Sequence, residues 1–344
     1  MAHEASGPDL YTLLGVHSRA CVEVIEGAYR ALSTLQHENP NHKERDHLLE
    51  RFTDAYDTLI NPERRKTYDE RLGEPLTGKV YGPWRILEQI AEGGCGRTYR
   101  GEHARLKHPV CLKHYAKVST DMDEVLMNEV RAVWDLRHYA IPVMRDAFQI
   151  PKDGSWVIVM SYIPGPTLAQ VIQKMGKIDP ENLCWILQRM INALEYLSWN
   201  GVVHGDIKPG NIILQPEYGR HMAVLIDYGL AMVKPTATDR NRGYMKLFSP
   251  PEQEEGLPLI PQTDMYSLGM TAIYALSGNE HHAQARRVPE ATPEPLKKFL
   301  HWLVRRDTLA RPHPQKDQLC DAILRVRQES FGRTHNENLP PLQY

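Results

Sequence analysis

The stretch VVHGDIKPGNIIL, residues 202–214, places three polar side chains between two apolar, β-branched runs. They are Asp206, Lys208 and Asn211, and a further carboxylate, Asp227, follows the apolar run MAVLI. Asn211 and Asp227 would offer the hard oxygen ligands that Mg²⁺ prefers. Asp206 could accept a proton from an attacking hydroxyl, and Lys208 could neutralise charge on a transferred phosphoryl group. Phosphoryl transfer requires such a base, metal ligands and a cation, all held in place beforehand.

The flanking segments predict how these side chains are positioned. The apolar residues around them have the character of short buried strands, and the turn sequence QPEYGRH joins them to a second strand, MAVLI. The polar groups would then emerge at the ends of neighbouring strands. A plainer interpretation stays open for these residues alone, because Asp206 and Asn211 flank a Pro-Gly corner and are common turn residues.

From residue 81 onward the sequence pattern predicts first strands and then helices. It begins with short strand-like runs such as VCLK and WVIVM, and after about residue 180 apolar residues at helical spacing predict long helices. The stripe that starts at Leu183 predicts a helix ending at Asn200-Gly201, a favourable C-terminal cap. We therefore expect an α+β domain over 81–327, β-rich first and α-helical afterwards.

The polar segment also carries a family resemblance. Asp206 and Asn211 in D-x-x-x-x-N, followed by Asp227 in D-[FY]-G, resemble the catalytic and magnesium loops of the eukaryotic-type protein kinase family. Other segments resemble further motifs of that family, in order: IAEGGCGRTYRG, VCLK, NEVRAVWDLRHYAI, VIVMSYI, SPPEQ, TDMYSLG and DTLARPH. The resemblance covers residues 81–327. It implies a bilobal kinase fold, the cofactors ATP and Mg²⁺, and a protein substrate with a serine or threonine hydroxyl, since Lys208 is typical of the Ser/Thr branch.

The resemblance implies a set of nucleotide-binding residues. Lys113 would contact the α- and β-phosphates with Glu129 as its partner, and Met160 and Tyr162 would lie in the segment that borders adenine. The glycine loop over the phosphates would comprise Ala91, Gly93, Gly96 and Thr98. Ala91 stands at the family's first glycine, and a Cβ is penalised by roughly 1 kcal/mol where φ is positive, so weaker nucleotide clamping is expected.

One departure from the family pattern concerns regulation. The residues before the expected base read His204-Gly205, whereas the family usually has an arginine directly before the aspartate. That arginine binds a phosphate on the activation segment. We therefore expect activity without phosphorylation of this segment at Thr236, Thr238 or Tyr244.

Two other interpretations of these motifs stay open. A nucleotide-binding pseudokinase would keep the fold without transferring phosphate, and His-Gly-Asp is also similar to small-molecule phosphotransferases of the aminoglycoside type. Lys208, Asp264 and Arg311 belong to the protein-kinase pattern, in which Arg311 would be the buried partner of Glu252. The enzymatic interpretation also requires Lys113 to meet the carboxylates in a cleft between the lobes.

The first 75 residues predict a separate helical module. Apolar stripes at helical spacing predict two helices, with QHENPNH between them, so an antiparallel hairpin is expected. Ser18 could cap the first helix, and Asn61 with Pro62 could start a third. The stripes comprise Val22, Ile25, Tyr29 and Leu32, then Leu48, Phe52, Ala55, Tyr56 and Leu59.

This module, residues 1–75, resembles the J-domain of DnaJ-type co-chaperones in DLYTLLGV, IEGAYRALSTLQHENPNH and FTDAYDTLINPERRKTYDERL. Family members that stimulate a DnaK-type ATPase carry His-Pro-Asp in the hairpin. Here His37-Glu38-Asn39 occupies that place, and the helix before it lacks the expected basic surface. We therefore expect a degenerate J-like module used for interaction or regulation, with a chaperone or regulatory protein as its possible partner.

The overall composition argues against several kinds of partner and site. A net charge of −2 offers no basic field for nucleic acid or acidic lipid, so neither partner is expected. The 5 scattered cysteines argue against a zinc site or disulfide scaffold, and no apolar run approaches the roughly 20 residues needed to cross a bilayer, so a cytoplasmic location without membrane attachment is expected. A linker is expected at 76–80 and a C-terminal tail at 328–344, with disorder expected at its end, NLPPLQY. The tryptophans lie in apolar patterns and are expected in the core: Trp84, Trp134, Trp156, Trp185, Trp199 and Trp302.

Overall fold

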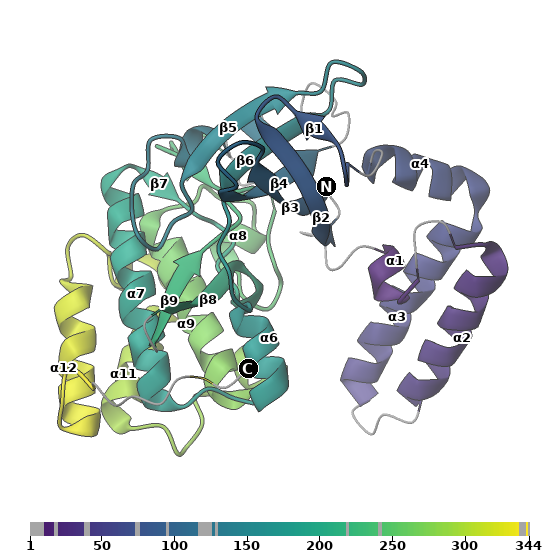
Figure 1. Cartoon of the computed structure of the whole chain (residues 1–344). Helices are drawn as coiled ribbons and strands as arrows, with labels where there is room; N and C mark the ends of the chain where they lie inside the picture. The colour runs from purple at the N-terminus through teal and green to yellow at the C-terminus, as the bar shows by residue number, and fades with distance from the viewer. Residues whose placement is uncertain are drawn as a thin grey trace. The chain divides into compact units, whose positions relative to one another are not determined.

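The structure is a computed structural model of the chain and describes residues 10–16, 20–37, 42–72, 76–93, 96–115, 126–127, 130–217, 220–239, 243–336 and 342. It divides into two compact units, one made of residues 6–120 and 145–160 and the other of 1–5, 121–144 and 161–344. The first unit contains a helical module and most of a six-stranded sheet, and the second is mainly helical (Figure 1). The expected α+β architecture, with a strand-rich part, a helical part and a preceding helical module, is confirmed.

The helical module consists of α1 (Leu10–Leu13), α2 (Val22–His37), α3 (His42–Ile60) and α4 (Pro62–Leu72). α2 and α3 run antiparallel (Figure 1), with Ile25 and Phe52 buried between them. The rings of Tyr29 and Tyr56 stack with centroids 4.3 Å apart. The predicted hairpin is therefore confirmed. His37 is the last residue of α2, whereas Ser18, Glu38 and Asn39 lie outside the described residues.

α4 begins as predicted. The Asn61 side chain accepts hydrogen bonds from the backbone N–H groups of Glu63 and Arg64 at 3.1 and 3.0 Å, which satisfies two of the donors at a helix start. At the other end of α4, Asp69 Oδ1 accepts a 2.6 Å hydrogen bond from the hydroxyl of Tyr11. The module thus has its own small core and a hydrogen bond that joins α1 to α4.

The sheet has the strand order β1-β2-β3-β4-β6-β5. Its strands are β1 (Val80–Tyr81), β2 (Trp84–Gly93), β3 (Gly96–His103), β4 (Pro109–Tyr115), β5 (Met144–Gln149) and β6 (Trp156–Ser161). Tyr99 and Leu112 lie opposite each other on the buried face. Leu76, in the predicted linker, is 1% exposed in the same core, and its backbone N–H donates to the Tyr99 hydroxyl at 3.1 Å. The chain is therefore anchored to the sheet before residue 81.

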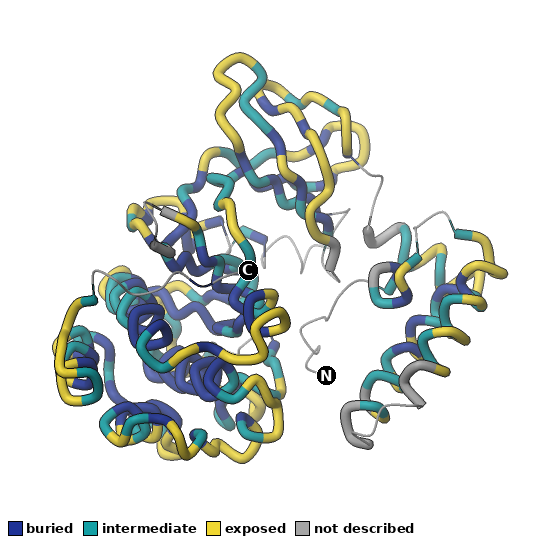
Figure 2. Tube along the Cα trace, turned by 60° about the horizontal axis from the view of Figure 1, so that its bottom comes forward, coloured by how far each residue is buried: buried dark blue, intermediate teal, exposed yellow. Residues whose placement is uncertain are grey.

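The second unit has a group of buried helices at its core (Figure 2). Its elements are α6 (Leu168–Met175), α7 (Pro180–Trp199), β7 (Val202–Val203), η1 (Pro209–Asn211), β8 (Ile212–Glu217), β9 (Arg220–Leu225), β10 (Met232–Val233), α8 (Pro251–Glu254), α9 (Pro261–Ser277), α10 (Glu280–Gln284), α11 (Glu294–Leu303), η2 (Thr308–Ala310) and α12 (Leu319–Phe331). Asp179 caps α7, and Asn200 follows its last residue, so the helix predicted from the apolar stripe ends where expected.

Two tryptophans expected in the core are exposed instead. Trp134 is 44% and Trp199 69% exposed, whereas Trp84 and Trp185 are buried. Trp134 lies in a turn after a short helical stretch, and Trp199 is the last residue of α7. At such positions the apolar stripe of a helix runs past the neighbours that would cover it.

The predicted C-terminal tail begins as a helix, and of NLPPLQY, where disorder is expected, only Leu342 lies within the described residues. α12 continues to Phe331, past the predicted domain end at 327. Beyond it, Arg333 binds both carboxylate oxygens of Glu181 in the first turn of α7, each at 2.8 Å, and Asn336 donates to Glu181 at 3.0 Å. The start of the tail is therefore held on the helical unit by a bidentate ion pair.

Candidate active site

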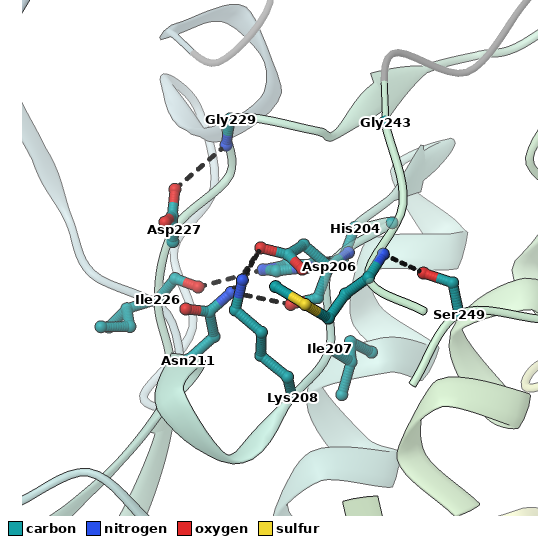
Figure 3. A network of polar contacts seen from close by, with 12 residues as sticks. His204, Asp206, Ile207, Lys208, Asn211, Ile226, Asp227, Gly229, Gly243 and Ser249 are labelled. Atoms are coloured by element: carbon teal, nitrogen blue, oxygen red, sulfur yellow. Dashed lines mark hydrogen bonds and ion pairs between the residues drawn. The ribbon is translucent and has the colours of Figure 1, made fainter. Parts of the chain in front are cut away.

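The loop after β7 carries the predicted base. β7 pairs with β10, and after residues 204–208 the chain passes through η1 into β8, which pairs with β9 in the predicted hairpin. Asp206 and Asn211 therefore lie at two ends of one short loop. Figure 3 shows Asp206, Lys208 and Asn211 pointing toward one another, with Asp227 on the neighbouring segment.

The Asp206 carboxylate is held by two neighbours. Its Oδ2 accepts hydrogen bonds from Lys208 Nζ and Asn211 Nδ2, both at 2.8 Å. Asn211 Nδ2 also donates to the backbone oxygen of Asp206 at 2.8 Å. The Asp206 side chain is only 8% exposed and that of Lys208 18%. The carboxylate is therefore fixed in one orientation and largely removed from water.

This environment tunes the acidity of Asp206. Burial, which disfavours the charged form, and the nearby Asp227 carboxylate raise the pKa of Asp206 to about 6, although Lys208 and Asn211 oppose the rise. A general base works best when its pKa lies near the operating pH. Asp206 is thus ionised at neutral pH yet basic enough to take a proton.

The backbone before Asp206 is held by a buried carboxylate. Asp264, in the first turn of α9, accepts the N–H groups of His204 and Gly205, both at 2.8 Å. Burial raises the pKa of Asp264 to about 7, and these two amide hydrogen bonds oppose the rise. The resemblance placed Asp264 only within the protein-kinase pattern, and these contacts show that it holds the backbone before Asp206.

The His204 ring links the base to the segment that carries Asp227. Its Nδ1 accepts the Asp206 N–H at 3.2 Å, so the ring proton lies on Nε2, which donates to Ile226 O at 3.2 Å. The ring also meets Tyr228 edge-on, with centroids 4.7 Å apart. Sequence reasoning missed this role, because no spacing rule joins His204 to a backbone oxygen 22 residues away.

Asn211 directly precedes β8 and Asp227 lies two residues after β9, so both flank the open end of the β8–β9 hairpin. Ile226 N–H donates to Asn211 O at 2.9 Å, which extends the strand pairing by one step and brings Asp227 beside the loop. Asp227 has a φ of +67°, so its backbone turns sharply here. Asn211 uses its amide N–H groups on Asp206, which leaves its amide oxygen as an acceptor. This donor set, a carboxylate and an amide oxygen, fits a hard cation such as Mg²⁺.

A buried ion pair between Arg311 and Glu252 holds α8 in place. Arg311 Nη2 donates to Glu252 Oε2 at 2.9 Å, and Arg311 Nε donates to Arg305 O at 2.6 Å. The guanidinium also lies over the ring of Tyr266, 4.7 Å from its centroid. The predicted pairing of Arg311 with Glu252 is therefore confirmed.

The predicted phosphate-binding residues of the sheet lie on paired strands. Thr98 of β3 is directly opposite Lys113 of β4 and opposite Ala91 of β2. This face is the reverse of the one that buries Tyr99, because successive residues of a strand alternate. Lys113 Nζ lies over the Tyr115 ring, 5.8 Å from its centroid.

The hairpin between β2 and β3 explains two of the loop residues. Gly93 pairs with Gly96 at its end. Gly96 has a φ of +153°, and a Cβ there would lie 2.1 Å from His114 O, so only glycine fits. Ala91, in contrast, is not among the residues with positive φ, and so the expected Cβ penalty on nucleotide clamping does not apply.

The remaining predicted nucleotide residues are only partly placed. Met160 lies in β6 and Tyr162 directly after it, both partly buried. Glu129 lies outside the described residues, so its pairing with Lys113 stays a prediction. The approach of Lys113 to Asp206 also stays a prediction, because the two residues belong to different units.

Comparison with known families identifies two domains in the chain. The model of the protein kinase domain matches residues 84–321, more than half of the chain. The chain belongs to the protein kinase family. The model of the DnaJ domain matches residues 9–69, so a J-domain region precedes the kinase domain. Within the part of the chain that the structure describes, no helix is long and apolar enough to cross a membrane.

The kinase is similar to several bacterial proteins. It is 34% identical over 211 residues to the serine/threonine-protein kinase PknK of Mycobacterium tuberculosis, covering 59% of this chain and 18% of that protein. It is 28% identical over 219 residues to PknA of Nostoc sp., covering 57% and 37%, and 27% identical over 270 residues to pkn2 of Myxococcus xanthus, covering 70% and 32%. The chain thus covers well under two thirds of these relatives.

Proposed function

We propose that this kinase transfers the γ-phosphoryl group of ATP to serine or threonine hydroxyls of a protein. The observation that carries the proposal is the Asp206 carboxylate, held at 2.8 Å by both Lys208 and Asn211 and given a pKa of about 6 by burial. The acceptor oxygen bonds to the γ-phosphorus as the bond to the β–γ bridging oxygen breaks. The hydroxyl proton passes to Asp206, and ADP leaves with the bridging oxygen.

The other site residues take roles that the resemblance implies. Asn211 and Asp227 would hold Mg²⁺, which neutralises phosphate charge when it is bound. Lys208 balances charge near the transferred group, and Lys113 with Glu129 binds the α- and β-phosphates. The adenine is bordered by the segment containing Met160 and Tyr162. The glycine loop that covers the phosphates comprises Ala91, Gly93, Gly96 and Thr98.

Two features favour a protein acceptor over a small molecule or an inactive fold. The ion pair between Glu252 and Arg311 belongs to the protein-kinase pattern. The relatives named above are serine/threonine-protein kinases by name.

The test is incubation of the full chain with γ-labelled ATP, Mg²⁺ and a cell extract of proteins and metabolites, followed by separation of labelled proteins from labelled small molecules. We expect label on protein serine and threonine. Label confined to small molecules would identify the aminoglycoside-type alternative, and binding of ATP without any transfer would identify a pseudokinase.

We propose further that the J-domain region binds a regulatory partner rather than stimulating a DnaK-type chaperone. His37-Glu38-Asn39 replaces the tripeptide of active co-chaperones. The full chain should therefore leave the ATPase rate of a DnaK-type chaperone unchanged, and a several-fold acceleration would refute this. A cytoplasmic location is consistent with the free cysteines Cys21, Cys111, Cys184 and Cys320.

A further inference from the structure

A buried glutamine joins two segments beside Asp206. Gln253 in α8 is 1% exposed, and its Nε2 donates to Gly205 O at 2.7 Å and to Gly243 O at 2.9 Å. Because both partners are carbonyl oxygens, the amide nitrogen must face them, and both N–H groups are used. Gly205 directly precedes the expected base, and Gly243 belongs to the activation segment (Figure 3).

The first of these bonds acts on the peptide group that carries Asp206. The oxygen of that group is Gly205 O, which Gln253 binds, and its N–H is that of Asp206, which donates to His204 Nδ1 at 3.2 Å. Asp264 holds the preceding N–H of Gly205 at 2.8 Å. The backbone is thus fixed on both sides of Gly205, and rotation of the Asp206 peptide would break the bond to Gln253.

The second bond holds the activation segment against the same loop. After Gly243 the segment forms a closed turn, in which Met245 N–H donates to Ser249 Oγ and Ser249 N–H to Met245 O, both at 2.8 Å. Figure 3 shows Gly243 and Ser249 beside the loop of Asp206.

Residue 205 has no room for a side chain that could make this connection itself. Its φ is +74°, and a Cβ there would lie 2.7 Å from Leu259 Cδ1 and 3.0 Å from Leu230 O. The family's usual arginine, which binds an activation-segment phosphate, is absent here. The amide of Gln253 supplies an uncharged contact between the same two segments. Gln253 itself is presented by α8, whose Glu252 is bound by the buried Arg311.

We propose that Gln253 is a positioning residue that holds the activation segment in register with Asp206 without phosphorylation. This inference rests on the proposed kinase activity. Gln253 acts through Gly205 and Gly243, neither of which is among the expected nucleotide-binding residues. Its loss should therefore lower kcat and raise the KM for the protein acceptor, while the affinity for ATP stays the same.

The test compares the full-length wild type with Gln253→Met, which keeps the side-chain length and loses both hydrogen bonds, and Gln253→Glu, which sets oxygens against two carbonyls. Gln188→Met is the matched control, because Gln188 accepts a 2.9 Å hydrogen bond from Arg327 in the same unit, away from the loop. Phosphoryl transfer to a protein acceptor, ATP affinity, thermal stability and amide hydrogen exchange are measured on each.

We expect kcat to fall about tenfold or more in Gln253→Met and further in Gln253→Glu. Gln188→Met should lose stability but keep its kcat within about twofold. In both Gln253 variants, and not in the control, amides of residues 243–249 should exchange at least about tenfold faster. An unchanged kcat, or a parallel loss of ATP affinity and stability, would overturn the proposal.

The exchange measurement separates this inference from the function itself. If the wild type transferred no phosphate, the proposed function would fail. The connection that Gln253 makes between the two segments would still be tested by amide hydrogen exchange. Faster exchange at residues 243–249 in Gln253→Met would then support the connection between the two segments. Exchange equal to that of the wild type would refute it.

Discussion

The pH dependence of phosphoryl transfer depends on the pair formed by Asp206 and Lys208. Asp206 must be ionised to accept a proton, and its pKa is raised to about 6 by burial. About nine tenths of the carboxylate is then ionised at pH 7 and about one tenth at pH 5. The rate of transfer, measured as kcat/KM, should therefore fall about tenfold between these values, with its midpoint near pH 6.

Replacing Lys208 with methionine should move this midpoint upward. The Lys208 ammonium is the strongest factor that lowers the pKa of Asp206, and it donates to Oδ2 at 2.8 Å. A hydrogen bond to a charged group contributes about 1.5–3 kcal/mol, and 1.36 kcal/mol corresponds to one pKa unit. The midpoint should rise by roughly one to two pH units, whatever happens to the maximal rate. Lys246→Met, at an exposed lysine of the activation segment, should leave it in place.

Acid unfolding would not mimic this result through Asp206. Its pKa in the folded chain, about 6, lies above its ordinary value of 3.8, so protonation favours the folded state. This contribution to stability is complete below pH 3.8 and is lost as the pH rises through 6. Tryptophan fluorescence should show a folded protein at pH 5. A flat rate between pH 7 and 5, or a midpoint that Lys208→Met moves downward, would refute the reasoning.

Two further predictions concern the activation segment and its support. Changing Thr236 and Thr238 to alanine and Tyr244 to phenylalanine should leave turnover within tenfold, because glycine replaces the phosphate-binding arginine before the base; a larger loss in a kinase assay would contradict this. Arg311→Met leaves the Glu252 carboxylate, 10% exposed, without its cation, and should cost about 3–5 kcal/mol and lower Tm by about 10 °C in a thermal melt. If the melting temperature stayed the same, the buried pair would have no structural role.

Much of the fold could be predicted from periodicity and turn chemistry. The cap at Asn61, the end of α7 at Asn200 and the β8–β9 hairpin all depend on neighbours within a few residues, which local patterns describe well. The same patterns placed Trp134 and Trp199 in the core incorrectly. An apolar stripe does not reveal where the packed neighbours of a helix stop.

The candidate site was predictable in its residues but not in its connections. The spacing of Asp206, Lys208 and Asn211 lies within one loop, so their contact follows from the sequence. The bonds of Gln253 join backbone oxygens 48 and 10 residues away, and neither acceptor has a side chain that could signal them. The glutamine stood in the recognised segment SPPEQ, yet only its glutamate neighbour had an expected partner.

The central claim is that Asp206 takes the proton of an acceptor hydroxyl while other residues bind ATP. It is tested most directly by measuring nucleotide affinity and phosphoryl transfer on the same preparation of Asp206→Asn. The amide keeps the size of the side chain and removes its basicity. We expect ATP affinity within about twofold of the wild type and turnover lower by about 10²- to 10⁴-fold. Turnover close to that of the wild type would contradict the assignment of Asp206 as the base.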